Sequence, residues 1–172
     1  MPRPEPTPLY HFTPIHHLGS IIEHGLLCDN GAAAGLLAIE VGNRGIKERR
    51  RRRAVPVGPR GVVADYVPLY FAPRSPMLYS IAMGNVPEYT GGVDPLVYLV
   101  TTTDRLAELG LPMLFTDRNA VLDTARFTGS LSDLDTLIDW PLMRATMWNN
   151  TPSEPDRKER RMAECLVHRQ VP

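Results

Sequence analysis

The sequence has few cysteines and lacks a recognisable metal-binding motif. Its 172 residues include two cysteines, Cys28 and Cys165, which lie far apart and outside any CxxC or Cys/His pattern. The five histidines include the pair His16-His17, but they form no HExxH motif and show no spacing typical of zinc ligands. We therefore expect two buried or partly buried free thiols and no metal cofactor.

Long hydrophobic runs are also absent. No stretch approaches the roughly 20 apolar residues that a helix needs to span a bilayer. The proline-rich start of the chain has no signal-peptide core. These two absences predict a protein with no membrane partner that acts in the cytoplasm.

The chain has no net charge, because 19 basic residues balance 19 acidic ones. The charges are nevertheless unevenly distributed. Residues 44–53 contain seven basic residues and one acid, and a second basic cluster lies at 157–161. Nucleic-acid binding depends on such local clusters, so zero net charge does not exclude a nucleic-acid partner. The arginine run Arg49–Arg53 fits a solvated basic face and a phosphate-binding segment equally well.

The pattern of elements predicts an α+β fold in one domain over residues 9–172, since short strands and short helices alternate irregularly. Residues 1–8 contain four prolines and are expected to form a flexible leader. Strands are expected at 9–13, 67–71, 96–101, 113–116 and 163–168. Helices are expected at 14–24 with Thr13 as N-cap, and at 76–82, 103–109, 139–148 and 155–162. The arginine run is expected to lie in a loop region.

Three of the strand-like stretches each carry one polar residue among apolar neighbours: His11, Tyr70 and Glu164. Burying an unpaired polar group costs on the order of 2–7 kcal/mol, so three such residues that converge would form a site. Each also has a structural interpretation, because His11 could bind a loop carbonyl, Tyr70 could pack in the core and Glu164 could point outward from an edge strand. Ser75 is similarly open to two roles, as a helix cap or as a ligand contact.

The motifs around these residues resemble those of the DarT family, the toxins of DarT–DarG toxin–antitoxin pairs. The resemblance runs from Leu9 to the end of the chain. It is carried by Tyr10-His11-Phe12-Thr13 and by the segments 21–26, 65–79, 97–100, 115–117, 134–140 and 157–167. It implies an ADP-ribosyltransferase (PARP-like) fold with central mixed or antiparallel sheets flanked by short helices.

The resemblance also implies an activity. The family transfers ADP-ribose from NAD to a base of single-stranded DNA, which is thymine in the better-known branch and guanine in another. It also implies a DarG-type macrodomain antitoxin as partner.

The resemblance assigns roles to particular residues. Glu164 corresponds to the catalytic glutamate, and Arg50, with Arg53 as second choice, corresponds to the arginine that acts on the base. The residues expected to contact NAD are His11, Phe12, Thr13, Gly19, Leu26, Tyr70 and Ser75. The residues expected to contact DNA are Arg49, Arg51, Arg52, Arg53 and Arg74.

The chain departs from the family pattern at two places. The family continues past the glutamate strand, whereas this chain stops at Pro172, as a truncated or short member would. Asn119 stands where some relatives carry a histidine, so we assign it no role. Two other functions remain open at this stage: an ADP-ribosyltransferase that acts on protein or RNA, and a non-catalytic nucleic-acid-binding module.

Overall fold

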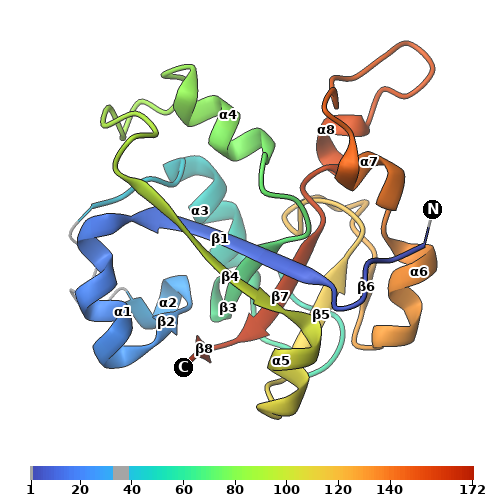
Figure 1. Cartoon of the computed structure of the whole chain (residues 1–172), viewed down its shortest axis with the longest axis horizontal. Coiled ribbons are helices and arrows are strands. Elements are labelled where there is room, and N and C mark those ends of the chain that lie inside the picture. Colours follow the sequence, from blue (N-terminus) through green and yellow to red (C-terminus); the bar gives the residue numbers. More distant parts are fainter. Residues whose placement is uncertain (1, 33–38) are drawn as a thin grey trace.

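A six-stranded antiparallel sheet forms the centre of the molecule in the computed structural model, which describes residues 2–32 and 39–172 (Figure 1). The strands of this sheet, in the order β4-β1-β3-β7-β5-β6, are β4 (Leu96–Thr102), β1 (Pro8–Pro14), β3 (Tyr66–Tyr70), β7 (Glu164–His168), β5 (Met113–Thr116) and β6 (Phe127–Thr128). A second sheet pairs β2 (Leu26–Leu27) with β8 (Gln170–Val171). The expected α+β class and antiparallel sheet are confirmed.

Short helices surround the sheet. The α-helices are α1 (Leu18–His24), α2 (Asp29–Ala32), α3 (Arg44–Arg52), α4 (Pro76–Ala82), α5 (Thr103–Glu108), α6 (Leu134–Leu137), α7 (Trp140–Arg144) and α8 (Arg157–Arg160). The described part of the chain also contains three 3-10 helices: η1 (Ile15–His17), η2 (Val63–Asp65) and η3 (Leu131–Asp133). Figure 1 shows α1 and α2 at one side of the molecule and α6, α7 and α8 at the opposite side.

β7 is an interior strand that is buried on both faces. Residues 164–167 have no exposed surface. Cys165 and Val167 pack in one core cluster with Trp140 and Leu69, whereas Leu166 packs in another cluster with Tyr66. Both cysteines are free and buried, as expected from their spacing. Because β7 lies between β3 and β5, its first residue, Glu164, is not at a sheet edge and does not point into solvent.

All five expected strands are present within about two residues of their expected bounds, but the arginine run was placed wrongly. Arg49–Arg52 form the last part of α3, and Arg53 caps the helix. The helix begins at Arg44 because the Asn43 side chain accepts a hydrogen bond from the backbone N–H of Ile46. The residues that follow are mostly Arg, Lys and Glu, which are good helix formers.

Two other helix expectations are also wrong. Thr13 belongs to β1 and caps no helix, because its hydroxyl is hydrogen-bonded to the ring of His17. The helix expected over 139–148 ends at Arg144, where the backbone becomes extended at Ala145. The carbonyl oxygens of Leu142 and Ala145 accept hydrogen bonds from the Arg161 guanidinium, and this tertiary contact replaces further helical bonds.

The proline-rich start of the chain contacts the body of the protein. Arg144 donates to the carbonyl oxygen of Pro2 at 2.9 Å, and Arg3 lies 3.8 Å from the Asp135 carboxylate. Thr7 is buried just before β1.

Over residues 2–32 and 39–172, no helix combines the length and apolar character needed to cross a bilayer. The same residues hold no group of three or more His, Cys, Asp or Glu side chains arranged to bind a metal ion.

Candidate active site

The three polar strand residues come together on adjacent strands. β3 lies between β1 and β7, and its Tyr70 is the cross-strand neighbour of Tyr10 on one side and of Glu164 on the other. Among the described residues, Tyr10↔Tyr70 is the one registered pair between β1 and β3, so the two strands separate beyond it. The ring of His11 bridges the separation with a 2.8 Å hydrogen bond to the carbonyl oxygen of Pro68.

A cavity of about 200 Å³ lies beside this separation. Its walls come from β1, η1, α1, β2, α2, segment 39–42, α3 and β3. Of the residues expected to contact NAD or the base, those that line the cavity are His11, Phe12, Thr13, Leu26, Tyr70 and Arg50. The structure therefore gathers six expected site residues from four separate elements around one space.

The Glu164 carboxylate is fully buried and is held by two protein groups. Arg50 Nη1 lies 3.0 Å and 3.3 Å from its two oxygens, and the backbone N–H of Ala120 donates to Oε1 at 3.2 Å. A buried carboxylate is tolerated when it is both paired with a cation and hydrogen-bonded. The interpretation of Glu164 as an outward-pointing edge residue is excluded.

The Arg50 guanidinium does not use all of its donors in the contact with Glu164. Its Nη2 is buried and has no hydrogen-bond partner within the part of the chain that the structure describes. A buried donor that stays unpaired costs about 1–3 kcal/mol. Because Arg50 lines the cavity, this nitrogen is placed to donate to an acceptor atom of a bound ligand.

The other arginines of the run point elsewhere. Arg51 and Arg53 form ion pairs at 3.2 Å and 3.1 Å with an aspartate of α2 and an aspartate between β5 and β6. Arg49 and Arg52 are exposed on α3. Of the two choices for the arginine that acts on the base, only Arg50 contacts the buried carboxylate.

His11 and Tyr70 are both uncharged in this site. Burial lowers the pKa of His11, and the nearby Arg50 charge lowers it further, although the hydrogen bond to Pro68 opposes this shift. A carbonyl oxygen only accepts, so Nδ1 carries the proton and Nε2 is left as an acceptor. Burial also raises the pKa of Tyr70, with a smaller contribution from the Glu164 charge, so its ring stays a neutral phenol.

Two residues at the site were missed by sequence reasoning. Ala120 contributes only its backbone N–H, which gives no side-chain signal. His17 accepts a hydrogen bond from the backbone N–H of Ile39 at 3.2 Å and contacts the Thr13 hydroxyl at 3.1 Å through its other ring nitrogen. The His16-His17 pair gives no metal-site signal in the sequence, but in the structure His17 connects segment 39–42 to β1.

Besides the four other arginines of the run, the predicted site residues Ser75, Arg74 and Gly19 also lie apart from the cavity. Ser75 is buried, and its hydroxyl caps α4 by accepting from the backbone N–H of Leu78 at 3.2 Å. Ser75 and Arg74 line a second cavity of about 470 Å³, together with Tyr79 and Trp148. Gly19 is exposed on α1 and does not line the first cavity. The geometry supports the capping role for Ser75, while NAD contacts of Ser75 and Gly19 stay predictions.

Comparisons with known proteins agree with this geometry. A family model described as "ssDNA thymidine ADP-ribosyltransferase, DarT" matches residues 10–172. A DNA ADP-ribosyl transferase from Thermus sp. (strain 2.9) is 44% identical over 170 residues, which cover 98% of this chain and 78% of that protein.

Two solved structures are also similar. Thermus sp. 2.9 DarT in complex with ADP-ribosylated ssDNA has a TM-score of 0.92 and 41% identity, and the match covers 100% of this chain and 79% of that one. The same protein in complex with NAD+ has a TM-score of 0.84 and 40% identity, with coverage of 99% and 79%. The expected ADP-ribosyltransferase fold is confirmed, and the chain belongs to the DarT family.

Proposed function

We propose that this chain transfers ADP-ribose from NAD to a thymine base of single-stranded DNA and releases nicotinamide. The observation that carries the proposal is the buried Arg50–Glu164 pair beside a cavity that His11 and Tyr70 also line. Membership of the DarT family supports the NAD donor and the single-stranded DNA acceptor. The description of the matching family model supports thymine over guanine.

The first chemical step is cleavage of the bond between ribose C1′ and the nicotinamide nitrogen. The bonding electrons leave with nicotinamide, and positive charge develops on the ribose. A carboxylate beside that ribose stabilises this charge and accepts a hydrogen bond from the 2′-hydroxyl, which is the role we give Glu164. His11 Nε2 accepts from a ribose hydroxyl, and the neutral ring of Tyr70 stacks on nicotinamide.

The second step joins the base to the ribose. A thymine ring nitrogen loses its proton to solvent and forms the new bond to C1′. The Arg50 guanidinium has only donors to offer, so it acts by donating to the base and by stabilising its negative charge. The base must be unpaired to reach the cavity, which suits a single-stranded substrate.

The remaining arginines supply contacts to the DNA backbone in this proposal. Arg49, Arg51 and Arg52 lie on α3 and Arg53 caps its end, and Arg74 lies near the paired rings of the exposed Tyr79 and the half-buried Trp148. A basic surface of this kind follows the phosphates, whereas aromatic rings accept unpaired bases. We also retain a DarG-type macrodomain antitoxin as the partner that reverses the modification, and the cytoplasm as the place of action.

The decisive experiment combines the purified chain with NAD and a mixed-sequence single-stranded oligonucleotide, followed by intact mass measurement. We expect a gain of one ADP-ribose on the oligonucleotide, and none on the matched duplex. Glu164→Gln keeps the shape of the side chain but removes its charge, so it should abolish the gain. Glu108→Gln, an exposed carboxylate on α5, is the matched control and should leave it intact.

Each contrary result identifies a different function. Label on RNA or on protein, with none on DNA, would replace the DNA acceptor by another one. Binding of the oligonucleotide with no NAD cleavage would indicate a non-catalytic nucleic-acid-binding module. Fragmentation of the product locates the label, and a label on guanine would overturn thymine as the target.

A further inference from the structure

The catalytic carboxylate is held by the turn that follows β5. The Thr116 hydroxyl at the end of β5 accepts a hydrogen bond from the backbone N–H of Glu164 at 3.2 Å and donates to the carbonyl oxygen of Arg118 at 2.7 Å. The backbone N–H of Ala120 donates to the Glu164 carboxylate. The position of that N–H therefore depends on the conformation of residues 116–120.

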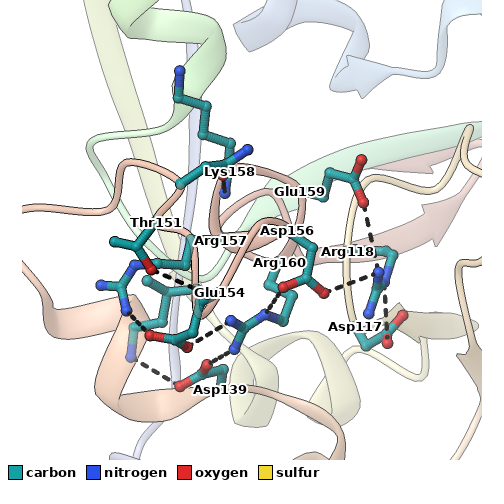
Figure 2. Close-up of polar contacts among 12 residues, drawn as sticks. Asp117, Arg118, Asp139, Thr151, Glu154, Asp156, Arg157, Lys158, Glu159 and Arg160 are labelled. Atoms are coloured by element: carbon teal, nitrogen blue, oxygen red, sulfur yellow. Dashed lines mark hydrogen bonds and ion pairs between the residues drawn. The ribbon is translucent and has the colours of Figure 1, made fainter.

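This turn is attached to α8 (Figure 2). Arg118 Nη1 lies 3.4 Å from the Asp156 carboxylate and 3.6 Å from the Glu159 carboxylate, and its Nε lies 3.4 Å from Asp117. The backbone N–H of Asn119 also donates to the carbonyl oxygen of Glu159 at 3.2 Å. The Arg118 side chain is only 17% exposed, so these ion pairs are partly shielded from solvent.

α8 is in turn fixed to the rest of the protein. The Arg160 guanidinium contacts three carboxylates, those of Asp139, Glu154 and Asp156 (Figure 2). The Asp139 side chain also caps α7 by accepting from the backbone N–H of Leu142. Charge networks with several shared partners are more rigid than isolated surface pairs. α8 thus gives Arg118 a fixed surface to bind.

We infer that Arg118 is a positioning residue for the reaction: it holds the turn so that the Ala120 N–H stays aimed at the Glu164 carboxylate. The inference rests on the proposed function, in which that carboxylate stabilises charge on the ribose. Without the guanidinium, the turn loses its ion pairs with Asp156 and Glu159, while Asp117 keeps Arg126 at 3.0 Å and Asp156 keeps Arg160 at 3.0 Å. The backbone hydrogen bond from Asn119 to Glu159 then holds the turn against α8 less firmly, so the turn shifts and the Ala120 N–H moves away from Glu164.

The test uses three variants of the full chain. Arg118→Met keeps the aliphatic stem and removes the charge, and Arg118→Lys restores a cation that reaches one carboxylate. Arg157→Met is the matched control, because Arg157 is similarly buried and pairs with Glu154 in the same network but does not contact the turn. Each variant is measured for kcat and for KM for NAD, and for its melting temperature. Binding is measured with carba-NAD+, an NAD analogue whose ring lacks the oxygen needed to support positive charge during cleavage.

We expect kcat of Arg118→Met to fall roughly 10- to 100-fold, since a displacement of about 1 Å has effects of this size. KM for NAD and the affinity for carba-NAD+ should change little, because Arg118 does not line the cavity. Arg118→Lys should recover part of kcat, and Arg157→Met should retain it.

The outcomes separate the inference from the proposed function. An inactive wild-type chain means that the proposed function fails. An active wild type with unchanged kcat in Arg118→Met overturns the inference alone. An equal loss of kcat in Arg118→Met and Arg157→Met also overturns it, as does a loss that follows the melting temperature, because either pattern indicates a general structural role.

Discussion

Glu164 and Arg50 depend on each other for their charges. The carboxylate has no exposed surface, and the guanidinium side chain is 11% exposed. Removing one partner leaves the other as a buried charge with little compensation, whereas replacing both partners leaves no buried charge. The pair that is proposed to act on NAD and on the base should therefore also affect stability.

Arg50→Met is expected to lower the free energy of unfolding by about 3 kcal/mol, because among the described residues the Glu164 carboxylate then keeps only the Ala120 N–H as a partner. The double variant Arg50→Met/Glu164→Gln should recover most of that loss, since no buried charge remains. Urea unfolding of the wild type, both single variants and the double variant gives the coupling energy directly. Additive effects of the two substitutions would show that the pair is not coupled in the folded protein.

Some of these site residues could be predicted from the sequence and others could not. His11, Tyr70 and Glu164 stood out because each is polar within an apolar stretch, and burial of such a residue needs a partner. The choice of Arg50 from five adjacent arginines depends on resemblance, because side-chain direction depends on the phase of a helix where the sequence predicts a loop. Ala120 could not be found at all, because every residue except proline has the same backbone N–H.

At the scale of the element, α3 separates its basic residues onto different sides. Lys47 and Arg50 are three residues apart and line the cavity, where Lys47 pairs with carboxylates of Asp29 and Glu40. Arg49 and Arg52 are also three residues apart and are exposed. Residues three apart lie on the same face of a helix. One helix therefore presents one arginine to the cavity and others to solvent.

This arrangement predicts a division of roles that salt dependence can test. Arg49→Ala and Arg52→Ala should each reduce the slope of log affinity against log salt for single-stranded DNA by about 0.7, the value for one phosphate contact. Binding of carba-NAD+ should not change. Arg105→Ala, which removes an exposed charge on α5, is the control and should leave the slope as it is. Unchanged slopes in Arg49→Ala and Arg52→Ala would assign those arginines to a solvated surface.

The longer strands were predictable and several helix bounds were not. β1, β3, β4, β5 and β7 carry apolar or β-branched runs bounded by turn residues, which is a local signal. Two-residue strands such as β2 and β8 have no such signal, because their pairing is set by the approach of distant segments. α7 ends early for a similar reason, since Arg161 takes the carbonyl oxygens that a longer helix would use.

Over the whole molecule, the cavity joins segments that are distant in sequence. Its walls include the N-terminal strand, segment 39–42, α3 and β3, and α3 carries Arg50 to the buried start of β7 near the C-terminus. A ligand that fills this cavity contacts all of these segments in the folded state and none of them together in the unfolded chain. Binding should consequently stabilise the fold as a unit.

Carba-NAD+ separates this binding from chemistry, because its ring lacks the oxygen needed to support positive charge during cleavage. At a concentration 100 times its dissociation constant, it should stabilise the protein by about 2.7 kcal/mol, which corresponds to a rise in melting temperature of about 5–10 °C. Glu164→Gln should keep most of this rise, because that side chain acts mainly on the charge that develops during cleavage. His11→Ala should lose most of it, because the imidazole that bridges β1 and β3 is proposed to bind the ligand itself. Thermal unfolding with and without carba-NAD+ measures all three, and an equal rise in His11→Ala would place the dinucleotide away from the gap between β1 and β3.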